Sequence, residues 1–235
     1  MEPIRLSKAV AALAGCSRRE AEHYITEGWV RVDGQVVVEP QARVAGERVE
    51  IDPKARLQPV VPATFLLHKP AGVDTPAAQA LLGADGRWTG DPSGIVRTRS
   101  HAAGLVALLA LPAPASGLAV FSQDARVIRK LQEDAPLIEQ ELVVDVEGSI
   151  APGGLQRLRG GLVFEGRPLP PAGVSWQSEK RLRFAVKDIR PEVVPWMCRQ
   201  VRLDVTALRR IRIGRVSMAG LPAGQWRYLA AGERF

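Results

Sequence analysis

The chain has 235 residues, 46% of them hydrophobic, which is enough to bury the core of one large domain or of a small and a medium one. Lys and Arg outnumber Asp and Glu by 32 to 25, and this net charge of +7 favours a polyanionic partner, with nucleic acid ahead of a membrane surface. The composition excludes an intrinsically disordered chain, and no apolar run reaches the roughly 18 residues of a membrane span.

The positive charge is concentrated towards the C-terminus. Residues 179–235 hold 13 Lys and Arg against 5 Asp and Glu, whereas the two kinds cancel in residues 1–60. The first residues lack the pattern of a signal peptide, so we expect a cytoplasmic protein with no membrane partner. Cys16 and Cys198 lie far apart without metal-ligand spacing, and we expect both to be reduced.

Two helices are predicted at the start of the chain. Apolar residues recur at helical spacing from Leu6 onwards, and Gly15 is placed to end this first helix. Ser17 and Glu20 have the spacing of a capping box, in which each residue satisfies a backbone N–H of the other. This box predicts a second helix that ends at Gly28.

A small sheet is predicted after these helices. The pair Asp33-Gly34 lies between alternating residues and indicates a tight turn between two strands. Residues 43–51 predict a further short strand pair. Arg18 and Arg19 lie at the N-terminus of the second helix, where free N–H groups and the helix dipole also favour phosphate.

Several groups of residues in this unit keep fixed spacings: Ile4-Arg5-Leu6-Ser7-Lys8, Ser17-Arg18-Arg19-Glu20-Ala21, Ile25, Gly28 and Val30-Arg31-Val32-Asp33-Gly34. Together they resemble the αL RNA-binding domain of ribosomal protein S4, over nearly all of residues 1–58. The resemblance implies a surface that recognises the backbone and shape of RNA rather than base edges. The residues expected on it are Arg5, Lys8, Ser17, Arg18, Arg19 and Arg31.

A proline-bearing segment, with the linker assigned to residues 59–63, separates this unit from a larger domain at residues 64–235. Residues 83–94 are rich in Gly, Asp and Pro and predict a flexible loop. Helices are expected at 125–133 and around 194–203, and strands at 64–69, 117–122, 142–146, 181–186, 208–213 and 225–229. Because strands dominate and crossover helices are few, we predict an α+β fold with a mixed, mainly antiparallel sheet.

Four segments of the larger domain carry a second resemblance: Leu67-His68-Lys69-Pro70-Ala71-Gly72, Ser116 to Asp124, Glu139 to Val144, and the closing run from Arg210 to Arg227. They resemble the catalytic domain of the bacterial rRNA pseudouridine synthases of the RsuA-like family, particularly its large-subunit branch. These enzymes isomerise a uridine that has been flipped out of its stack, and they need no metal or organic cofactor. The resemblance implies further RNA contacts at Lys69, Arg190, Arg210 and Arg212.

The family's essential residue is missing from this pattern. The family holds its catalytic aspartate in a run Gly-Arg-Leu-Asp-x-Asp-x-Ser-Gly-Leu, and aligning Ser116-Gly117-Leu118 with the end of that run puts Pro112 at the aspartate. The family's stacking tyrosine falls at Leu142, and only Arg190 and Met197 remain of its basic run. Since these groups serve one site, their joint loss predicts an inactive homologue.

We therefore expect a monomeric RNA-binding protein that docks on rRNA or a ribosomal precursor without modifying it. One alternative is an active synthase that uses a relocated carboxylate, Asp91 or Asp124. Another is a protein assembly factor whose basic surface is incidental. His23, His68 and His101 show no triad or metal pattern and are expected to be structural.

Overall fold

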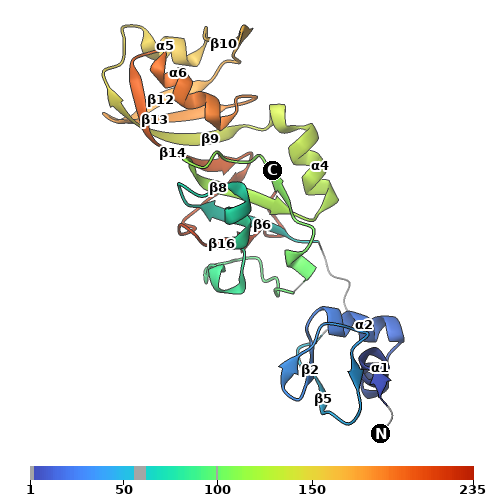
Figure 1. Cartoon of the computed structure of the whole chain (residues 1–235). Helices are drawn as coiled ribbons and strands as arrows, with labels where there is room; N and C mark the ends of the chain where they lie inside the picture. Colours follow the sequence, from blue (N-terminus) through green and yellow to red (C-terminus); the bar gives the residue numbers. More distant parts are fainter. Residues whose placement is uncertain (1–2, 56–61, 99) are drawn as a thin grey trace. The chain divides into compact units, whose positions relative to one another are not determined.

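The computed structural model describes residues 3–55, 62–98 and 100–235, which form two compact units (Figure 1). Unit 1 comprises Met1–Pro62 with Val96–Gly104, and unit 2 comprises Ala63–Ile95 with Leu105–Phe235. Of the predicted linker at 59–63, only Pro62 and Ala63 lie among the described residues, so that boundary stays a prediction. Within the described ranges no helix is long and apolar enough to cross a membrane.

The two helices of unit 1 form where the sequence predicts them. Helix α1 spans Leu6–Ala14, and Gly15 ends it in the left-handed conformation with φ 61°. Helix α2 spans Arg18–Thr26. The backbone N–H of Glu20 donates to Ser17 Oγ at 3.3 Å, and the backbone N–H of Ser17 donates to the Glu20 carboxylate at 2.7 Å. The predicted capping box is confirmed.

The strands of unit 1 pair differently from the prediction at one place. Strands β2 (Val30–Val32) and β3 (Gln35–Val36) flank the turn at Asp33 and Gly34, as predicted. Residues 43–51 do form two strands, β4 (Arg43–Val44) and β5 (Val49–Ile51), but these do not pair with each other. Strand β4 pairs with β1 (Ile4–Arg5), and β5 pairs with β2. The predicted strand pair is therefore wrong, because each strand completes a different sheet.

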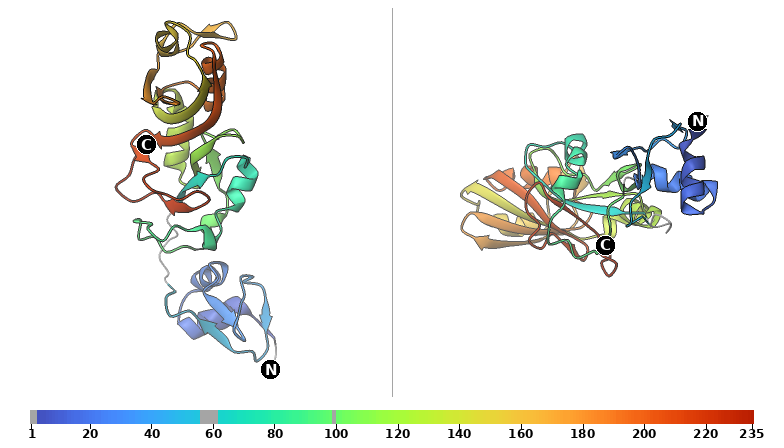
Figure 2. Two further views of the ribbon diagram at one scale, coloured as in Figure 1. Left: turned by 90° about the vertical axis from the view of Figure 1, so that its left-hand side faces the viewer. Right: turned by 90° about the horizontal axis from the view of Figure 1, so that it is seen from below.

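Unit 2 is built on one twisted, mostly antiparallel sheet, in which the long strands β9 and β14 curve together (Figure 2). The strand order is β12-β13-β9-β14-β8-β6-β16, with β15 paired to β14 and β7 paired to β8. The strands span Thr64–Lys69 (β6), Val106–Leu108 (β7), Ser116–Ser122 (β8), Gln140–Gly148 (β9), Gly173–Ser178 (β12), Arg181–Val186 (β13), Leu203–Ile213 (β14), Val216–Ser217 (β15) and Trp226–Tyr228 (β16). A small hairpin, β10 (Val163–Phe164) with β11 (Arg167–Pro168), lies outside this sheet.

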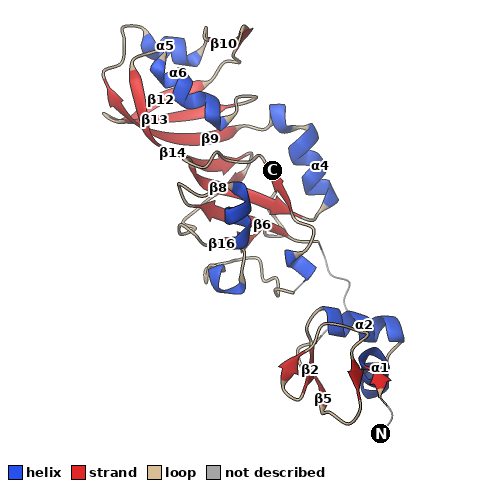
Figure 3. Ribbon diagram, viewed as in Figure 1, coloured by secondary structure: helices blue, strands red, loops and turns tan. Residues whose placement is uncertain are grey.

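Short helices pack around the sheet of unit 2 (Figure 3). Helix α4 spans Ala125–Glu133, in agreement with the prediction. Helix α6 spans only Val194–Arg199, because Leu203 already begins β14. Helices α3 (Thr75–Ala80) and α5 (Gly154–Arg159) were not predicted, since each is six residues long.

The core of unit 2 divides at the middle of the sheet. On β9, β13 and β14, buried side chains such as Leu142, Phe184 and Leu208 pack with Val194 and Met197 of α6. Strands β6, β8 and β16 carry other clusters, one of which contains the touching rings of Phe65, Trp226 and Tyr228. Loop 83–94, predicted to be flexible, is anchored to this second half, where Trp226 Nε1 donates to the Gly83 carbonyl at 2.8 Å.

The two halves of the sheet meet where β14 runs parallel to β8. Two residue pairs, Arg209 with Ser116 and Arg210 with Gly117, make this junction. Gly117 has φ +108°, and a Cβ built there would lie 2.2 Å from the Arg210 carbonyl oxygen. Neither the backbone conformation nor the space allows a larger residue.

The first prediction concerns this junction. We expect Gly117→Ala to lower the free energy of unfolding by more than about 3 kcal/mol, because a left-handed conformation and a backbone clash combine. Urea unfolding followed by circular dichroism measures the change.

Gly94→Ala is the matched control. Gly94 also has a positive φ, +66°, but nothing lies within 4 Å of a Cβ built there. It should therefore cost only about 1–2 kcal/mol. Equal losses in the two variants would contradict the close approach of the strands.

Candidate functional site

The stretch Ala110–Ala115, at which the sequence resemblance breaks, folds into a turn over the core. The Ala115 N–H donates to the Pro112 carbonyl at 3.0 Å, and the Gly72 N–H donates to the Ala113 carbonyl at 2.7 Å. Leu111 is 4% exposed and belongs to the same apolar cluster as Leu142. The stretch is therefore tied to the loop after β6 and buries the side chains of Leu111 and Ala115.

The Lys69 side chain joins the loop after β6 to the Ala110–Ala115 stretch by hydrogen bonds. Its side chain is buried, and Nζ donates to the carbonyls of Pro70 at 3.1 Å, Val73 at 2.6 Å and Ala113 at 3.2 Å. An ammonium group has three N–H donors, and here all three are used. Burial lowers the pKa of Lys69, an effect that Asp74 opposes and Arg210 reinforces. The Lys69 ammonium thus faces inward and is fully engaged, so the RNA contact predicted at Lys69 would require it to exchange these carbonyls and stays a prediction.

Arg210 is a fully buried guanidinium at the centre of the sheet. Its Nε donates to the Leu118 carbonyl at 2.9 Å, and Nη1 donates to the Gln140 side-chain oxygen at 2.8 Å. Its Nη2 has no hydrogen-bond partner, and no carboxylate forms an ion pair with Arg210 among the described residues. Burial lowers the pKa of Arg210 to about 9. Because Arg210 is 0% exposed, the RNA contact predicted there would need the sheet to open, and it stays a prediction.

Other positions at which the resemblance breaks are apolar and are buried or partly buried. Leu142, 0% exposed, lies in the core cluster with Ile189 and Val193. Trp196 packs edge-on against the ring of Phe164, with ring centroids 5.0 Å apart. These positions serve packing between α6 and the sheet rather than a polar pocket.

The chain is similar to several known proteins over most of its length. Residues 4–49 match the S4 domain model. "Ribosomal large subunit pseudouridine synthase B" of Bacillus subtilis is 28% identical over 97% of this chain and 93% of its own. An "Uncharacterized RNA pseudouridine synthase" of Aquifex aeolicus is 26% identical over 98% of this chain and 94% of its own.

A crystal structure of a pseudouridylate synthase has the same fold, with a TM-score of 0.60 and 19% identity over 97% of this chain and 96% of that one. The chain is a homologue of the RNA pseudouridine synthases. The predicted S4-type N-terminal domain and the predicted α+β fold with a mainly antiparallel sheet are both confirmed.

In this synthase homologue, Asp91 has a structural role. Its carboxylate forms an ion pair with Arg87 at 2.7 Å and accepts hydrogen bonds from the N–H groups of Ser93 and Tyr228. Burial by itself would raise the pKa of Asp91, but the hydrogen bonds from Ser93, Arg87 and Tyr228 outweigh it and lower that pKa. Tyr228 belongs to β16, two strands away from β8, so the carboxylate is held at another part of the sheet.

Asp124 also lies away from the Ala110–Ala115 stretch. It caps α4, where it accepts from the Arg126 N–H at 2.8 Å and forms an ion pair with the Arg126 guanidinium at 3.0 Å. It follows the far end of β8, and a strand that runs from Ser116 to Ser122 is roughly 20 Å long. Asp91 and Asp124 are therefore both paired with arginines away from the Ala110–Ala115 stretch.

The side chains predicted to bind RNA in the S4-type domain are exposed in unit 1: Arg5, Lys8, Ser17, Arg18, Arg19 and Arg31. Arg18 and Arg19 occupy the first turn of α2, where Arg18 contacts Glu22 at 3.1 Å with 63% of its side chain still exposed. No contact joins the members of this set, so a shared RNA surface stays a prediction.

Arg190 and Arg212, two residues of unit 2 that are predicted to contact RNA, differ in how strongly other side chains hold them. Arg190 has a 72% exposed side chain and only a 3.5 Å contact with Glu192. Arg212 is held by Glu139 at 2.6 Å and by Glu141 at 2.8 Å. Arg190 is therefore available to a ligand, whereas Arg212 would have to exchange a carboxylate for a phosphate.

The second prediction tests whether the Ala110–Ala115 stretch is part of the core. Leu111→Ala should lower the free energy of unfolding by about 3 kcal/mol, because it removes a buried side chain and leaves a cavity against Leu142. Urea denaturation gives the value.

Pro114→Ala serves as the control within the same stretch. Pro114 is exposed, so its replacement should change stability by less than about 1 kcal/mol. A Leu111→Ala variant as stable as this control would mean that the stretch does not close over the core.

Proposed function

We propose that this protein binds rRNA or a ribosomal precursor on a pseudouridine-synthase scaffold and does not isomerise uridine. The observation that carries the proposal is the stretch Ala110–Ala115, which has no carboxylate and packs closed through Leu111 and the Lys69 hydrogen bonds. The proposal includes a monomer in the cytoplasm.

RNA binding is supported by three features. The S4 domain match and the relatives named as RNA pseudouridine synthases suggest an RNA partner. The net charge of +7 favours a polyanion. Arg18 and Arg19 lie exposed at the start of α2, where the helix N-terminus also attracts phosphate.

The absence of catalysis is supported by chemistry. The family resemblance assigns nucleophilic or base catalysis to an aspartate at the position of Pro112, and proline offers neither a carboxylate nor an N–H. The two proposed substitutes, Asp91 and Asp124, are already engaged by arginines elsewhere on the sheet. Leu142, at the place of the stacking tyrosine, is buried in the core. To be active, the protein would have to release one of these aspartates from its arginine and move Leu142 out of the core.

The third prediction tests RNA binding. Doubly substituted Arg18→Ala, Arg19→Ala protein should bind fragments of rRNA more weakly and with a flatter dependence on salt, because each lost phosphate contact removes about 0.7–0.9 from the slope of log K against log salt concentration. Filter binding over a salt series measures both quantities.

Arg48→Ala with Lys54→Ala removes the same charge from two other exposed positions of unit 1 and should leave binding nearly unchanged. The RNA-binding proposal would be refuted if wild-type affinity for rRNA fragments did not depend on salt, or if both double variants lost the same affinity.

The fourth prediction tests catalysis. Total rRNA from a deletion strain and from its parent should contain the same pseudouridines, as read by chemical mapping or mass spectrometry. A pseudouridine that disappears on deletion and returns on treatment with purified protein would establish an active synthase and refute inactivity.

A protein assembly factor, the remaining alternative, is separated by the same two experiments. It would leave the modification pattern unchanged and would also fail to bind rRNA in a salt-dependent way.

A further inference from the structure

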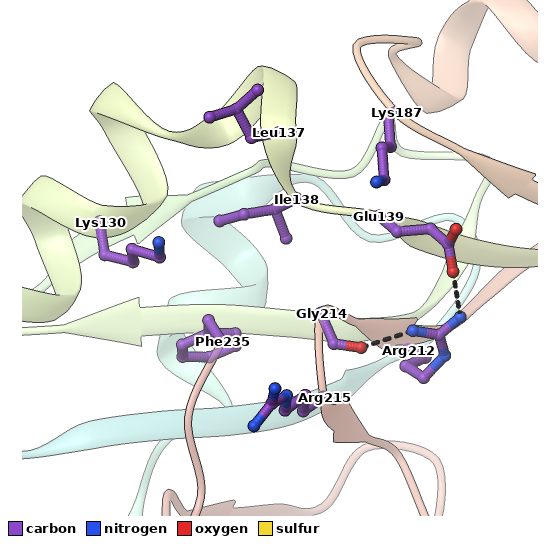
Figure 4. Close-up of a pocket in the computed structure, with 9 residues that line it drawn as sticks. All are labelled: Lys130, Leu137, Ile138, Glu139, Lys187, Arg212, Gly214, Arg215 and Phe235. Atoms are coloured by element: carbon purple, nitrogen blue, oxygen red, sulfur yellow. Dashed lines mark hydrogen bonds and ion pairs between the residues drawn. The ribbon is translucent and has the colours of Figure 1, made fainter. Parts of the chain in front are cut away.

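Unit 2 contains a hollow of about 470 Å³ whose lining is strongly basic (Figure 4). Lys130 of α4, Lys187 after β13, Arg212 of β14 and Arg215 after β14 line it, together with the Glu139 side-chain carboxylate and Phe235, the last residue of the given sequence. Figure 4 shows Lys130, Lys187 and Arg215 on different sides of the hollow. Such a concentration of cations attracts an anionic ligand.

Two of these cations are not neutralised by the protein. Lys130 pairs with Asp134 at 2.7 Å, and Arg212 is held by Glu139 at 2.6 Å. Lys187 and Arg215 are exposed, and neither has an ion pair or a side-chain hydrogen bond within the described part of the chain. Their positive charges are therefore available to a phosphate group.

The hollow also has an apolar side. Leu137 is 72% exposed although it is a large aliphatic residue, and the half-buried ring of Phe235 lies across from it (Figure 4). A base can stack on an aromatic or aliphatic surface while its phosphate meets a cation, which is how proteins hold single-stranded nucleic acid without reading its sequence. A base paired in a duplex cannot enter in this way.

The hollow is separate from the altered stretch at Pro112. It lies at the C-terminal end of β14, around Arg212 and Gly214. The Ala110–Ala115 stretch precedes β8, whose first residues pair with Arg209 and Arg210 of β14. The hollow therefore does not belong to the former catalytic position.

We propose that this hollow binds one nucleotide of a single-stranded RNA segment, with its phosphate at Lys187 and Arg215 and its base against Phe235 and Leu137. The inference rests on the proposed RNA-binding function and deepens it. It gives unit 2 a contact with unpaired RNA that is independent of Arg18 and Arg19 in unit 1.

The charge half of the proposal is tested with full-length protein and a short fluorescein-labelled oligouridylate, by fluorescence anisotropy at several salt concentrations. The double variant Lys187→Gln, Arg215→Gln should bind about tenfold more weakly, with a salt slope flatter by about 1.4, since single strands lose about 0.7 for each phosphate contact. The double variant Arg167→Gln, Arg199→Gln removes the same charge from exposed positions outside the hollow and should bind within about twofold of wild type. Equal losses in the two double variants would overturn the assigned site.

The stacking half is tested with Phe235→Ala. It should weaken binding to the oligouridylate at least about fivefold while leaving binding to an abasic oligomer of the same length unchanged, because only the former has bases to stack. Because Phe235 also packs against the core, Leu137→Ser provides a second variant at an exposed position, with a smaller loss of the same kind. If both variants bind both oligomers as wild type does, or if a polyglutamate peptide competes as well as the oligouridylate, no nucleotide site exists here.

The outcomes separate this inference from the proposed function. If wild-type protein binds rRNA fragments but not the oligouridylate, only the proposed nucleotide site in the hollow is refuted. Protein that binds neither refutes the proposed function as well. An Arg18→Ala, Arg19→Ala variant that loses rRNA fragments and keeps the oligouridylate supports both.

Discussion

The fold of unit 2 depends on the short junction at which β14 runs parallel to β8. Only two residue pairs join the halves of the sheet there, and Arg210 reinforces them by donating to Leu118 on β8 and to Gln140 on β9. The absence of a side chain at Gly117 lets the backbones approach. The buried Arg210 guanidinium thus stabilises the junction through side-chain hydrogen bonds, where a continuous antiparallel sheet would have further backbone pairs. It forms no ion pair with a carboxylate among the described residues.

That missing counter-charge links the fold to the proposed loss of activity. A buried cation is ordinarily paired, because removing it from water costs several kcal/mol. Here the protein compensates with carbonyl groups, which accept from Arg210 and from all three donors of Lys69. The same hydrogen bonds hold Ala113 in place and close the stretch over the core. In this chain these polar groups stabilise the packing of the turn against the sheet.

Local sequence signals predicted local structure well. The capping box at Ser17, the turn at Asp33-Gly34, helix α4 and strand β13 are all found where the pattern put them, because each is decided by residues close in sequence. The pairing of β4 with β1 and of β5 with β2 was not predictable, since alternation indicates a strand and not its partner.

The site was harder to predict than the fold. The run Leu208-Arg209-Arg210-Ile211-Arg212 puts arginines on both faces of a strand, and nothing in it shows that Arg210 is the buried one. Lys69 gave a better signal, because it follows the apolar run Phe65-Leu66-Leu67 in the same strand, and such a run is typical of a strand buried on both faces. The basic hollow joins residues from α4, two loops and β14, so no single motif could reveal it.

The buried charges of Lys69 and Arg210, neither of which forms an ion pair within the described residues, also bear on how the chain can change in evolution. The Lys69 ammonium touches the Ala113 carbonyl and is close enough to Arg210 for their repulsion to lower its pKa. A carboxylate that arose by mutation in this turn would enter a region of positive potential, and Coulomb attraction would favour it. A mutation to an acidic residue in this turn would therefore be favoured electrostatically, whereas Leu142 would still occupy the core beside it. Under the proposed function, a carboxylate would thus be easier for this chain to acquire than the space to hold a uridine beside it.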